Sequence, residues 1–358
     1  MLTATLPDQR RREYGPGAEM SSRASLGAMT AAQAGQVVFT RGGVPESVHQ
    51  VHAAVVDASG DVVAVCGDAG LVTFPRSSSK PVQALPLALV VPELPEDEVA
   101  IACASHAGTP EHLGVVERLL ARSGSTVADL RCGTHPPFDA GTAAHLIRWG
   151  ERPTPLHHNC SGKHAGMLLA CVRGGWPREG YTEHGHPLQV RIRELHAELG
   201  GVGLEDVRAG TDGCSVPAFA LPLHASARIF GQLAAPQGEL APALERIFGA
   251  MTAHPFLIAG PGRLDTTLMP LVSGLAAKMG AEAFYGMALR ETPQGPLGVA
   301  FKIVDGGERA RPHVALALLE ALGVPVTPEL RALAPTTLSN WAGREVGTVE
   351  AHVGLTWV

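Results

Sequence analysis

VHQVHAAVVDASGDVVAV, residues 48–65, is the first of two segments that predict the fold. Apolar residues flank the turn DASGD, a pattern typical of a β-hairpin. A second hairpin pattern lies near the other end of the chain, where residues 283–290 and 297–305 flank the turn TPQG. Because both ends of the chain carry strands, we expect one antiparallel sheet formed from both chain ends.

Most of the chain between the hairpins shows helical patterns. We expect an α/β fold with helices on the faces of the sheet, at 80–91, 110–123, 163–174, 187–199, 216–231, 239–253 and 312–322. Pro222 should kink one of these helices. Residues 1–33 lack periodicity, and no Pro/Ser-rich linker interrupts the rest. We therefore predict a flexible N-terminal tail at 1–33 and a single domain at 34–358.

The composition narrows the class of protein. The chain has 358 residues, of which 45% are apolar, and this is enough to bury a large core. A net charge of −6 and an aromatic content of 4% argue against a nucleic-acid partner. The longest apolar run is far shorter than the roughly 20 residues of a membrane helix, and the N-terminus does not resemble a signal peptide. We therefore expect a cytoplasmic protein with no membrane partner, whose six cysteines are free thiols or metal ligands.

Lysine is rare in this chain. Of its 28 Lys and Arg residues only four are lysine, namely Lys80, Lys163, Lys278 and Lys302. A buried ammonium group can lose its proton, whereas a guanidinium group cannot. Each lysine is therefore a candidate functional group, and chance retention is the alternative.

Two segments place serines where they could act as nucleophiles. RSSSKPVQ at 76–83 puts Ser77 three residues before Lys80, on the same face if the turn is helical. In Ser-x-x-Lys motifs a neutral lysine amine takes the proton from the serine hydroxyl. An N-capped helix with a surface lysine is the alternative. Ser105 follows what we interpret as a short apolar strand at 99–104 and lies on a Gly-rich turn.

Two further segments gather thiols and nitrogen ligands. HHNCSGKHAGM at 157–167 brings Cys160, Lys163 and His164 together before an apolar helix. The tight turn TDGCS presents Cys214. Cys160, Cys214 and a nitrogen ligand form a plausible Zn²⁺ site, and two unrelated buried cysteines are the alternative.

KMG at 278–280, just before the second hairpin, resembles the Lys-Thr-Gly element of penicillin-recognising serine enzymes. In those enzymes Ser-x-x-Lys, a lone serine and Lys-x-Gly follow one another in the order found here. This order favours a serine β-lactamase-like fold. Met279 stands where those enzymes have threonine, so a hydroxyl beside Lys278 is missing.

The segments RSSSKPVQ, CASH, NCSGKHAGM and DGCSVP together resemble the rhizobial-type L-asparaginases, or asparaginase II family. The resemblance spans about residues 38–322. It implies a serine β-lactamase-like fold, a homodimer, and hydrolysis of L-asparagine to L-aspartate and ammonia.

The resemblance also implies roles for particular residues. The catalytic residues would be two serine–lysine pairs, Ser77 with Lys80 and Ser105 with Lys278. Zinc would be held by Cys160, Lys163 and Cys214, and would not be essential for the chemical step. Asp212 would lie close to the zinc. Apart from the resemblance, we expect Arg76 and His164 to bind substrate carboxylates, and we include Asp212 among the substrate-binding residues.

The hypothesis that follows has Ser77 attacking the side-chain amide, with neutral Lys80 as base. The second pair would relay a proton to the departing ammonia, and backbone N–H groups near Ser77 would hold the oxyanion. Three alternatives remain open from the residues. They are a penicillin-recognising-type acyl hydrolase acting on another amide, a metal-dependent amidohydrolase, and a non-catalytic zinc-binding amino-acid sensor.

Overall fold

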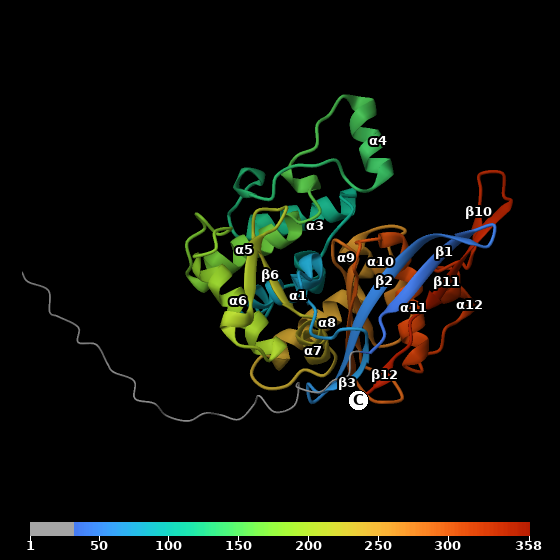
Figure 1. Cartoon of the computed structure of the whole chain (residues 1–358). Helices are drawn as coiled ribbons and strands as arrows, with labels where there is room; N and C mark the ends of the chain where they lie inside the picture. The colour runs from blue at the N-terminus through green and yellow to red at the C-terminus, as the bar shows by residue number, and fades with distance from the viewer. Residues whose placement is uncertain (1–31) are drawn as a thin grey trace, which may run out of the picture. The chain divides into compact units, whose positions relative to one another are not determined.

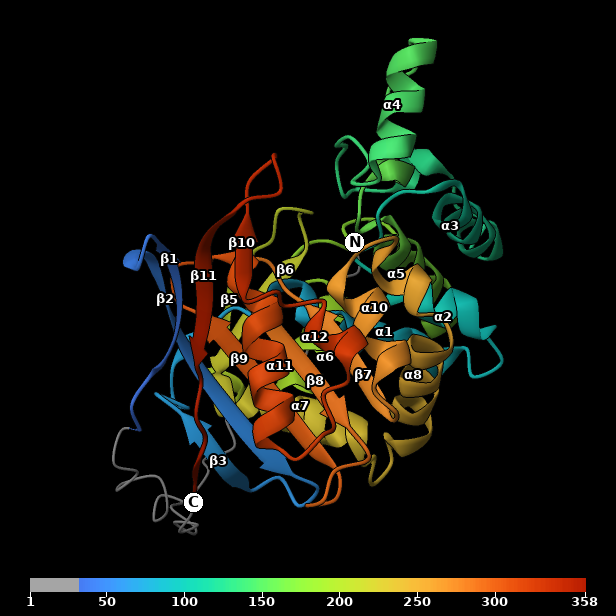
Figure 2. The ribbon, with the colours of Figure 1, turned by 90° about the vertical axis from the view of Figure 1, so that its right-hand side faces the viewer.

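The central sheet joins the two ends of the described chain. The structure is a computed structural model that describes residues 32–358, so the predicted tail at 1–33 lies almost wholly outside the described residues. Strand β2 (Val44–Asp57) pairs antiparallel with β9 (Leu297–Ile303) over their whole overlap. The blue and orange strands of Figure 2 meet along this seam. The prediction of one antiparallel sheet formed from both chain ends is confirmed.

The strands follow one another across the sheet in the order β10, β11, β1, β2, β9, β8, β7, and β3 pairs with both β2 and β12. The predicted hairpins are β2–β3 and β8–β9. The remaining bounds are β1 Gly35–Arg41, β3 Val62–Cys66, β7 Leu275–Met279, β8 Phe284–Leu289, β10 Thr337–Ser339, β11 Glu345–His352 and β12 Thr356–Trp357. A separate small sheet has the order β4 (Val72–Thr73), β6 (Pro217–Pro222), β5 (Arg208–Thr211).

Helices cover both faces of the central sheet. Helix α7 (Leu223–Ala234) packs on β2, β8 and β9, and α11 (Arg311–Ala321) lies on the opposite face (Figure 2). A Cβ at Gly298 would lie 2.1 Å from the backbone nitrogen of Gly231, so glycine lets β9 and α7 approach closely. Strands β7 and β8 are buried on both faces, which explains their nearly continuous apolar sequences.

The expected helices are largely present. Their bounds are α1 Lys80–Val90, α3 Pro110–Arg122, α5 Ser161–Gly174, α6 Pro187–Gly200 and α8 Ala241–Ala253, besides α11. Further helices are α2 Glu96–Ala102, α4 Ala140–Trp149, α9 Pro255–Ala259, α10 Leu264–Leu271 and α12 Pro328–Arg331. Figure 1 shows α4 extending away from the other helices.

Two local predictions were wrong. The helix expected at 216–231 is strand β6 followed by α7, and Pro222 ends the strand with an extended ψ of 147° instead of kinking a helix. The strand expected at 99–104 is the end of α2, whose first turn carries Glu96, Asp97 and Glu98. Acidic residues in a first turn stabilise a helix, and this signal outweighs the short apolar run. Within residues 32–358, every helix is too short or too polar to cross a membrane.

Candidate active site

Lys80 and Ser105 lie together in the interior. Lys80 is the first residue of α1 and is buried. Its Nζ donates to Ser105 Oγ at 2.9 Å, to the carbonyl of Ala104 at 2.5 Å and to the carbonyl of Asn159 at 3.3 Å. The start of α1 is therefore tied to the loop after α2 and to the segment that precedes α5. This is a serine–lysine pair, although it is not the pairing that the resemblance implied for Ser105.

Ser77 lies one turn before Lys80, in a 3₁₀-helix over Arg76–Ser79. Its side chain is partly exposed, whereas that of Ser78 is buried and donates to the carbonyl of Lys278 at 2.6 Å. A Cβ at Gly280 would lie 2.2 Å from the carbonyl oxygen of Pro75. The end of β7 thus packs directly against the 3₁₀-helix and leaves Ser77 on its accessible side.

Lys278 is fully buried near the end of β7. Its Nζ donates to the carbonyl of Met279 at 3.1 Å and lies 3.4 Å from Asp265 Oδ2. Within residues 32–358 no hydrogen bond joins Lys278 to Ser105 or Lys80 to Ser77. The contacts present are Lys80–Ser105 and Lys278–Asp265. Burial lowers the pKa of Lys278 to about 8, with the charge of Asp265 acting against this and that of Lys80 adding to it.

Both amines also act on one buried thiol. Burial raises the pKa of Cys103 to about 12, and the charges of Lys278 and Lys80 oppose the rise. The hydrogen bond from Ser78 to the carbonyl of Lys278 brings the end of β7 beside the start of α1, so Lys278 lies near Lys80 and Ser105.

Cys160, Lys163 and Cys214 form a second cluster. Lys163 Nζ donates to Cys214 Sγ at 3.0 Å, and the Cys160 thiol is hydrogen-bonded to the same sulfur. That hydrogen bond and the charge of Lys163 lower the pKa of Cys214, although burial opposes them. Burial alone would lower the pKa of Lys163, but the charges of both sulfurs outweigh it and raise the pKa. Lys80 donates to the carbonyl of Asn159, the residue before Cys160, so this cluster adjoins the amine site.

The donor chemistry of this cluster fits zinc. Two thiols and one amine converge, and thiolates with nitrogen ligands are typical of Zn²⁺ sites. Within the described residues, no three His, Cys, Asp or Glu side chains are gathered around one point suited to a metal ion. A zinc ion here would therefore need Lys163 as its third protein ligand, and Lys163 would have to release a proton.

The three expected substrate-binding residues do not all lie together: Arg76 contacts Asp212, and His164 lies elsewhere. Arg76 donates through Nε and Nη2 to Asp212 Oδ1 at 2.9 and 2.6 Å, and 30% of the Arg76 side chain and 12% of that of Asp212 remain exposed. Arg76 has a φ of 52°, a conformation unusual for a residue other than glycine. His164 is fully buried, and its Nδ1 is 2.8 Å from the hydroxyl of Tyr181. Burial lowers the pKa of His164, and a contact with Cys214 opposes this, so His164 adjoins the thiol cluster.

Sequence reasoning missed three residues of this region. The carbonyl of Asn159 accepts a hydrogen bond from Lys80, and His106 Nε2 lies 2.9 Å from Ser161 Oγ at the start of α5. Asn159 and His106 both lie inside motifs quoted above, so the sequence did indicate that they could belong to the site. Asp265, beside Lys278, lies in a segment with no motif, so nothing local indicated it.

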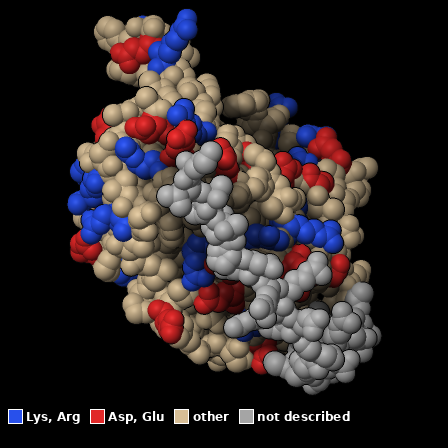
Figure 3. Space-filling model, turned by 90° about the vertical axis from the view of Figure 1, so that its left-hand side faces the viewer, with Lys and Arg blue, Asp and Glu red and all other residues tan. Residues whose placement is uncertain are grey.

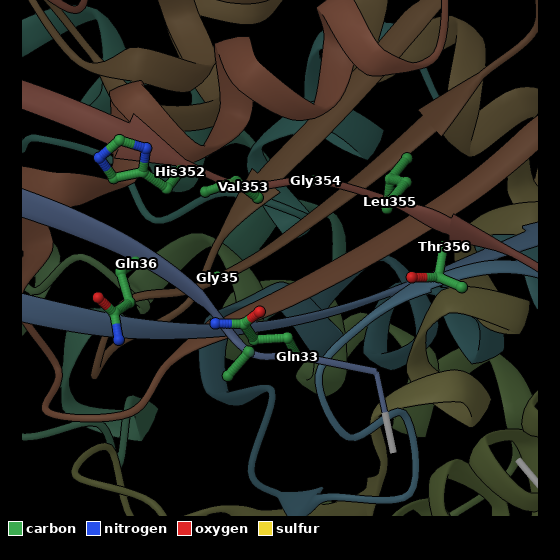
Figure 4. A pocket seen from close by; sticks show the side chains of 9 residues that line it. Gln33, Gly35, Gln36, His352, Val353, Gly354, Leu355 and Thr356 are labelled. Carbon is green, nitrogen blue, oxygen red and sulfur yellow. The ribbon is translucent and has the colours of Figure 1, made fainter. Parts of the chain in front are cut away.

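Two hollows lie elsewhere on the described surface. One, of about 600 Å³, lies between Gln33–Gln36 and His352–Thr356 (Figure 4). The other, of about 630 Å³, lies beside α11 and α12. None of the candidate catalytic, substrate-binding or metal residues lines either hollow.

Comparisons with known proteins bear on these observations. A family model described as L-asparaginase II matches residues 37–351 of the chain. No curated protein matches the sequence. Among solved structures, the native form of Mglu is 13% identical over 75% of this chain, with a TM-score of 0.41. A Bacillus subtilis glutaminase in covalent complex with 5-oxo-L-norleucine is 11% identical over 78% of this chain and 88% of its own, with a TM-score of 0.37. The chain spans 64% of the length of the Mglu chain.

Proposed function

The chain belongs to the L-asparaginase II family, and we propose that it is an amidohydrolase specific for the side-chain amide of L-asparagine, which it converts to L-aspartate and ammonia. The observation that carries this proposal is the Lys80 amine, which is buried and hydrogen-bonded to Ser105 Oγ one helical turn after the partly exposed Ser77. A pure binding protein has no need of a buried amine hydrogen-bonded to a serine hydroxyl.

Ser77 is the nucleophile in this proposal. It is the accessible serine, whereas Ser105 is 2% exposed and already held by Lys80. Lys80 acts after it has released one of the three protons that it donates in the structure, and then takes the proton of Ser77 while the Ser77 oxygen forms a bond to the amide carbon. Backbone N–H groups at the start of the 3₁₀-helix hold the oxyanion. The hydrogen bond to Ser105 orients the Lys80 amine toward Ser77 in this proposal.

Lys278 supplies the other proton. In its ammonium form it protonates the leaving nitrogen as the C–N bond breaks, and ammonia departs. Water then attacks the β-aspartyl ester and gives a proton to Lys278. The Ser77 oxygen leaves with the proton held by Lys80, so both lysines return to their starting states.

Arg76 and Asp212 support recognition of an α-amino acid. Their partly exposed pair offers a positive and a negative charge side by side. The α-carboxylate of the substrate would bind Arg76 and its α-ammonium group Asp212, because each makes a charge-assisted hydrogen bond.

Zinc is proposed at Cys160, Lys163 and Cys214. When bound, the ion would supply positive charge that orders the segments 157–164 and 211–215 around the substrate. With two thiolates it has little Lewis acidity left, and the chemical steps above do not need it.

We also propose a cytoplasmic homodimer. Ile147 and Trp149 on α4 are 81% and 66% exposed, and large apolar side chains so exposed are typical of an interface. Basic and acidic side chains are interspersed on the face shown in Figure 3 and do not gather into one stripe, and we propose no nucleic-acid partner.

Ammonia release from asparagine, glutamine and β-aspartyl peptides tests the function. We expect turnover of asparagine above the other two, and its loss in Ser77→Ala. Hydroxylamine added during turnover should yield β-aspartyl hydroxamate, because it intercepts the ester. Full turnover by Ser77→Ala, with loss in Ser105→Ala, would transfer the nucleophilic role to Ser105. Binding of asparagine without ammonia release would favour the sensor.

A further inference from the structure

A buried carboxylate stands behind Lys278. Asp265, in the first turn of α10, is fully buried. Its Oδ2 accepts a hydrogen bond from the Met279 backbone N–H at 3.0 Å and lies 3.4 Å from Lys278 Nζ. Asp265 therefore holds both the backbone and the side chain at the end of β7.

The surroundings of Asp265 leave part of its charge uncompensated. Asp265 Oδ1 and the Tyr285 hydroxyl are buried near each other, and neither makes a hydrogen bond of normal geometry among residues 32–358. Tyr285 lies on β8 directly opposite Met279, and its pKa is raised by burial and by the charge of Asp265. The hydroxyl thus stays protonated beside the carboxylate. A buried carboxylate with so few partners is costly, which indicates that a neighbouring cation compensates it.

Charged groups on several elements face Lys278. Lys80 on α1 and Arg263, which precedes α10, both disfavour its ammonium form. Burial acts in the same direction. Asp265 is the group that favours the ammonium form, both through its charge and through its contact with Nζ.

We propose that Asp265 is a positioning residue that keeps Lys278 protonated at neutral pH, so that Lys278 can deliver a proton to the departing ammonia. This inference rests on the proposed function. Asp265 does not touch the substrate in this scheme. It acts by stabilising the ammonium form that exists before the C–N bond breaks and again after water has attacked.

The test compares Asp265→Asn with Glu98→Gln, which neutralises another buried carboxylate, one paired with Arg122. In Asp265→Asn we expect the alkaline decline of kcat to move to lower pH by about one to three units, the usual effect of a close opposite charge. In Glu98→Gln the decline should stay in place. Loss of kcat in Asp265→Asn with an unmoved decline would mean a merely structural role and would overturn the proposal.

Lysine NMR provides a readout independent of activity. Because the chain has only four lysines, ¹³C-labelled lysine gives few side-chain signals, and Lys278→Arg identifies that of Lys278. Its titration midpoint should fall in Asp265→Asn, and an unchanged midpoint refutes the proposal even in an inactive protein. Absence of ammonia release by the wild-type protein would instead refute the proposed function alone.

A double mutant covers the case in which Asp265→Asn folds poorly. Lys278→Met leaves the Asp265 carboxylate without its cation, and adding Asp265→Asn removes that lone charge. We expect the double variant to melt at a higher temperature than Lys278→Met. A double variant that melts lower would show that Asp265 does not serve Lys278.

Discussion

Two buried lysines at one site differ in their partners, and this difference assigns their roles. Lys80 faces a hydroxyl and two carbonyls, none of which carries a charge. Lys278 faces the carboxylate of Asp265. Neutral partners suit an amine that must accept a proton, whereas an anionic partner suits an ammonium group that must donate one.

The activity should therefore fall with increasing pH. The pKa of Lys278 is about 8, and the proposed mechanism needs its protonated form. As pH rises through 8 this form is lost, so kcat for ammonia release should decline between about pH 7 and pH 9. Lys278→Met should lower kcat by about 100- to 10,000-fold and remove this decline. A wild-type profile that is flat up to pH 9.5 would contradict the assigned role.

Substitution at Asp212 should affect binding of the amino group. Asp212→Asn removes the carboxylate proposed to bind the α-ammonium group. We expect KM for asparagine to rise by about tenfold or more, because a charged hydrogen bond contributes about 1.5–3 kcal/mol. Succinamate, which lacks the amino group, serves as the control substrate, and its KM should change little. Equal increases for both substrates would argue against this role.

At the scale of elements, the end of β7 positions the 3₁₀-helix that carries Ser77. Gly280→Ala would place a Cβ 2.2 Å from the carbonyl oxygen of Pro75, and the helix would have to move. We expect loss of activity and destabilisation by about 1–3 kcal/mol, measured by denaturant unfolding. Gly249→Ala, on α8 with no atom within 4 Å, is the control and should keep full activity. Normal activity in Gly280→Ala would show that the contact between Gly280 and Pro75 is not needed for catalysis.

The thiol cluster should bind zinc and tie two segments together. We expect Cys214→Ser to lose bound zinc, measured by elemental analysis after dialysis, because a hydroxyl is a poor replacement for a thiolate. Cys171→Ser, a buried cysteine of α5 that takes no part in the cluster, should keep it.

Zinc removal from the wild-type protein should raise KM for asparagine more than it lowers kcat, since the ion is proposed to position the substrate. A collapse of kcat in a protein that remains folded would instead favour the metal-dependent alternative.

At the scale of the whole molecule, α4 offers the surface most suited to a second copy of the chain. Replacing Ile147 by Asp buries a charge if α4 lies in an interface, so the variant should elute as a single copy in light-scattering chromatography. Val190→Asp alters a residue on α6 that is 41% exposed and should not change the mass. A dimer that survives Ile147→Asp would place the interface elsewhere.

Local pattern was sufficient for much of the architecture. Turn residues between apolar segments identified both hairpins, and helical periodicity identified α1, α3, α5, α6, α8 and α11, because these signals act over a few neighbouring residues. The same reasoning failed at β6, whose extended form depends on pairing with β5. It also failed at α2, where acidic capping outweighed a short apolar run.

The candidate catalytic and metal-binding residues could be named from the sequence. The chain has only four lysines, and the segments that carry the serines and thiols are short. The residues that each of them contacts could not be named from the sequence. Ser105 contacts Lys80, which is 25 residues away in the sequence, and Arg76 contacts Asp212, which is 136 residues away. Asp265 meets Lys278 because α10 packs against β7. Such contacts depend on how distant elements pack, and packing is settled by the burial of the whole core, which no local pattern records.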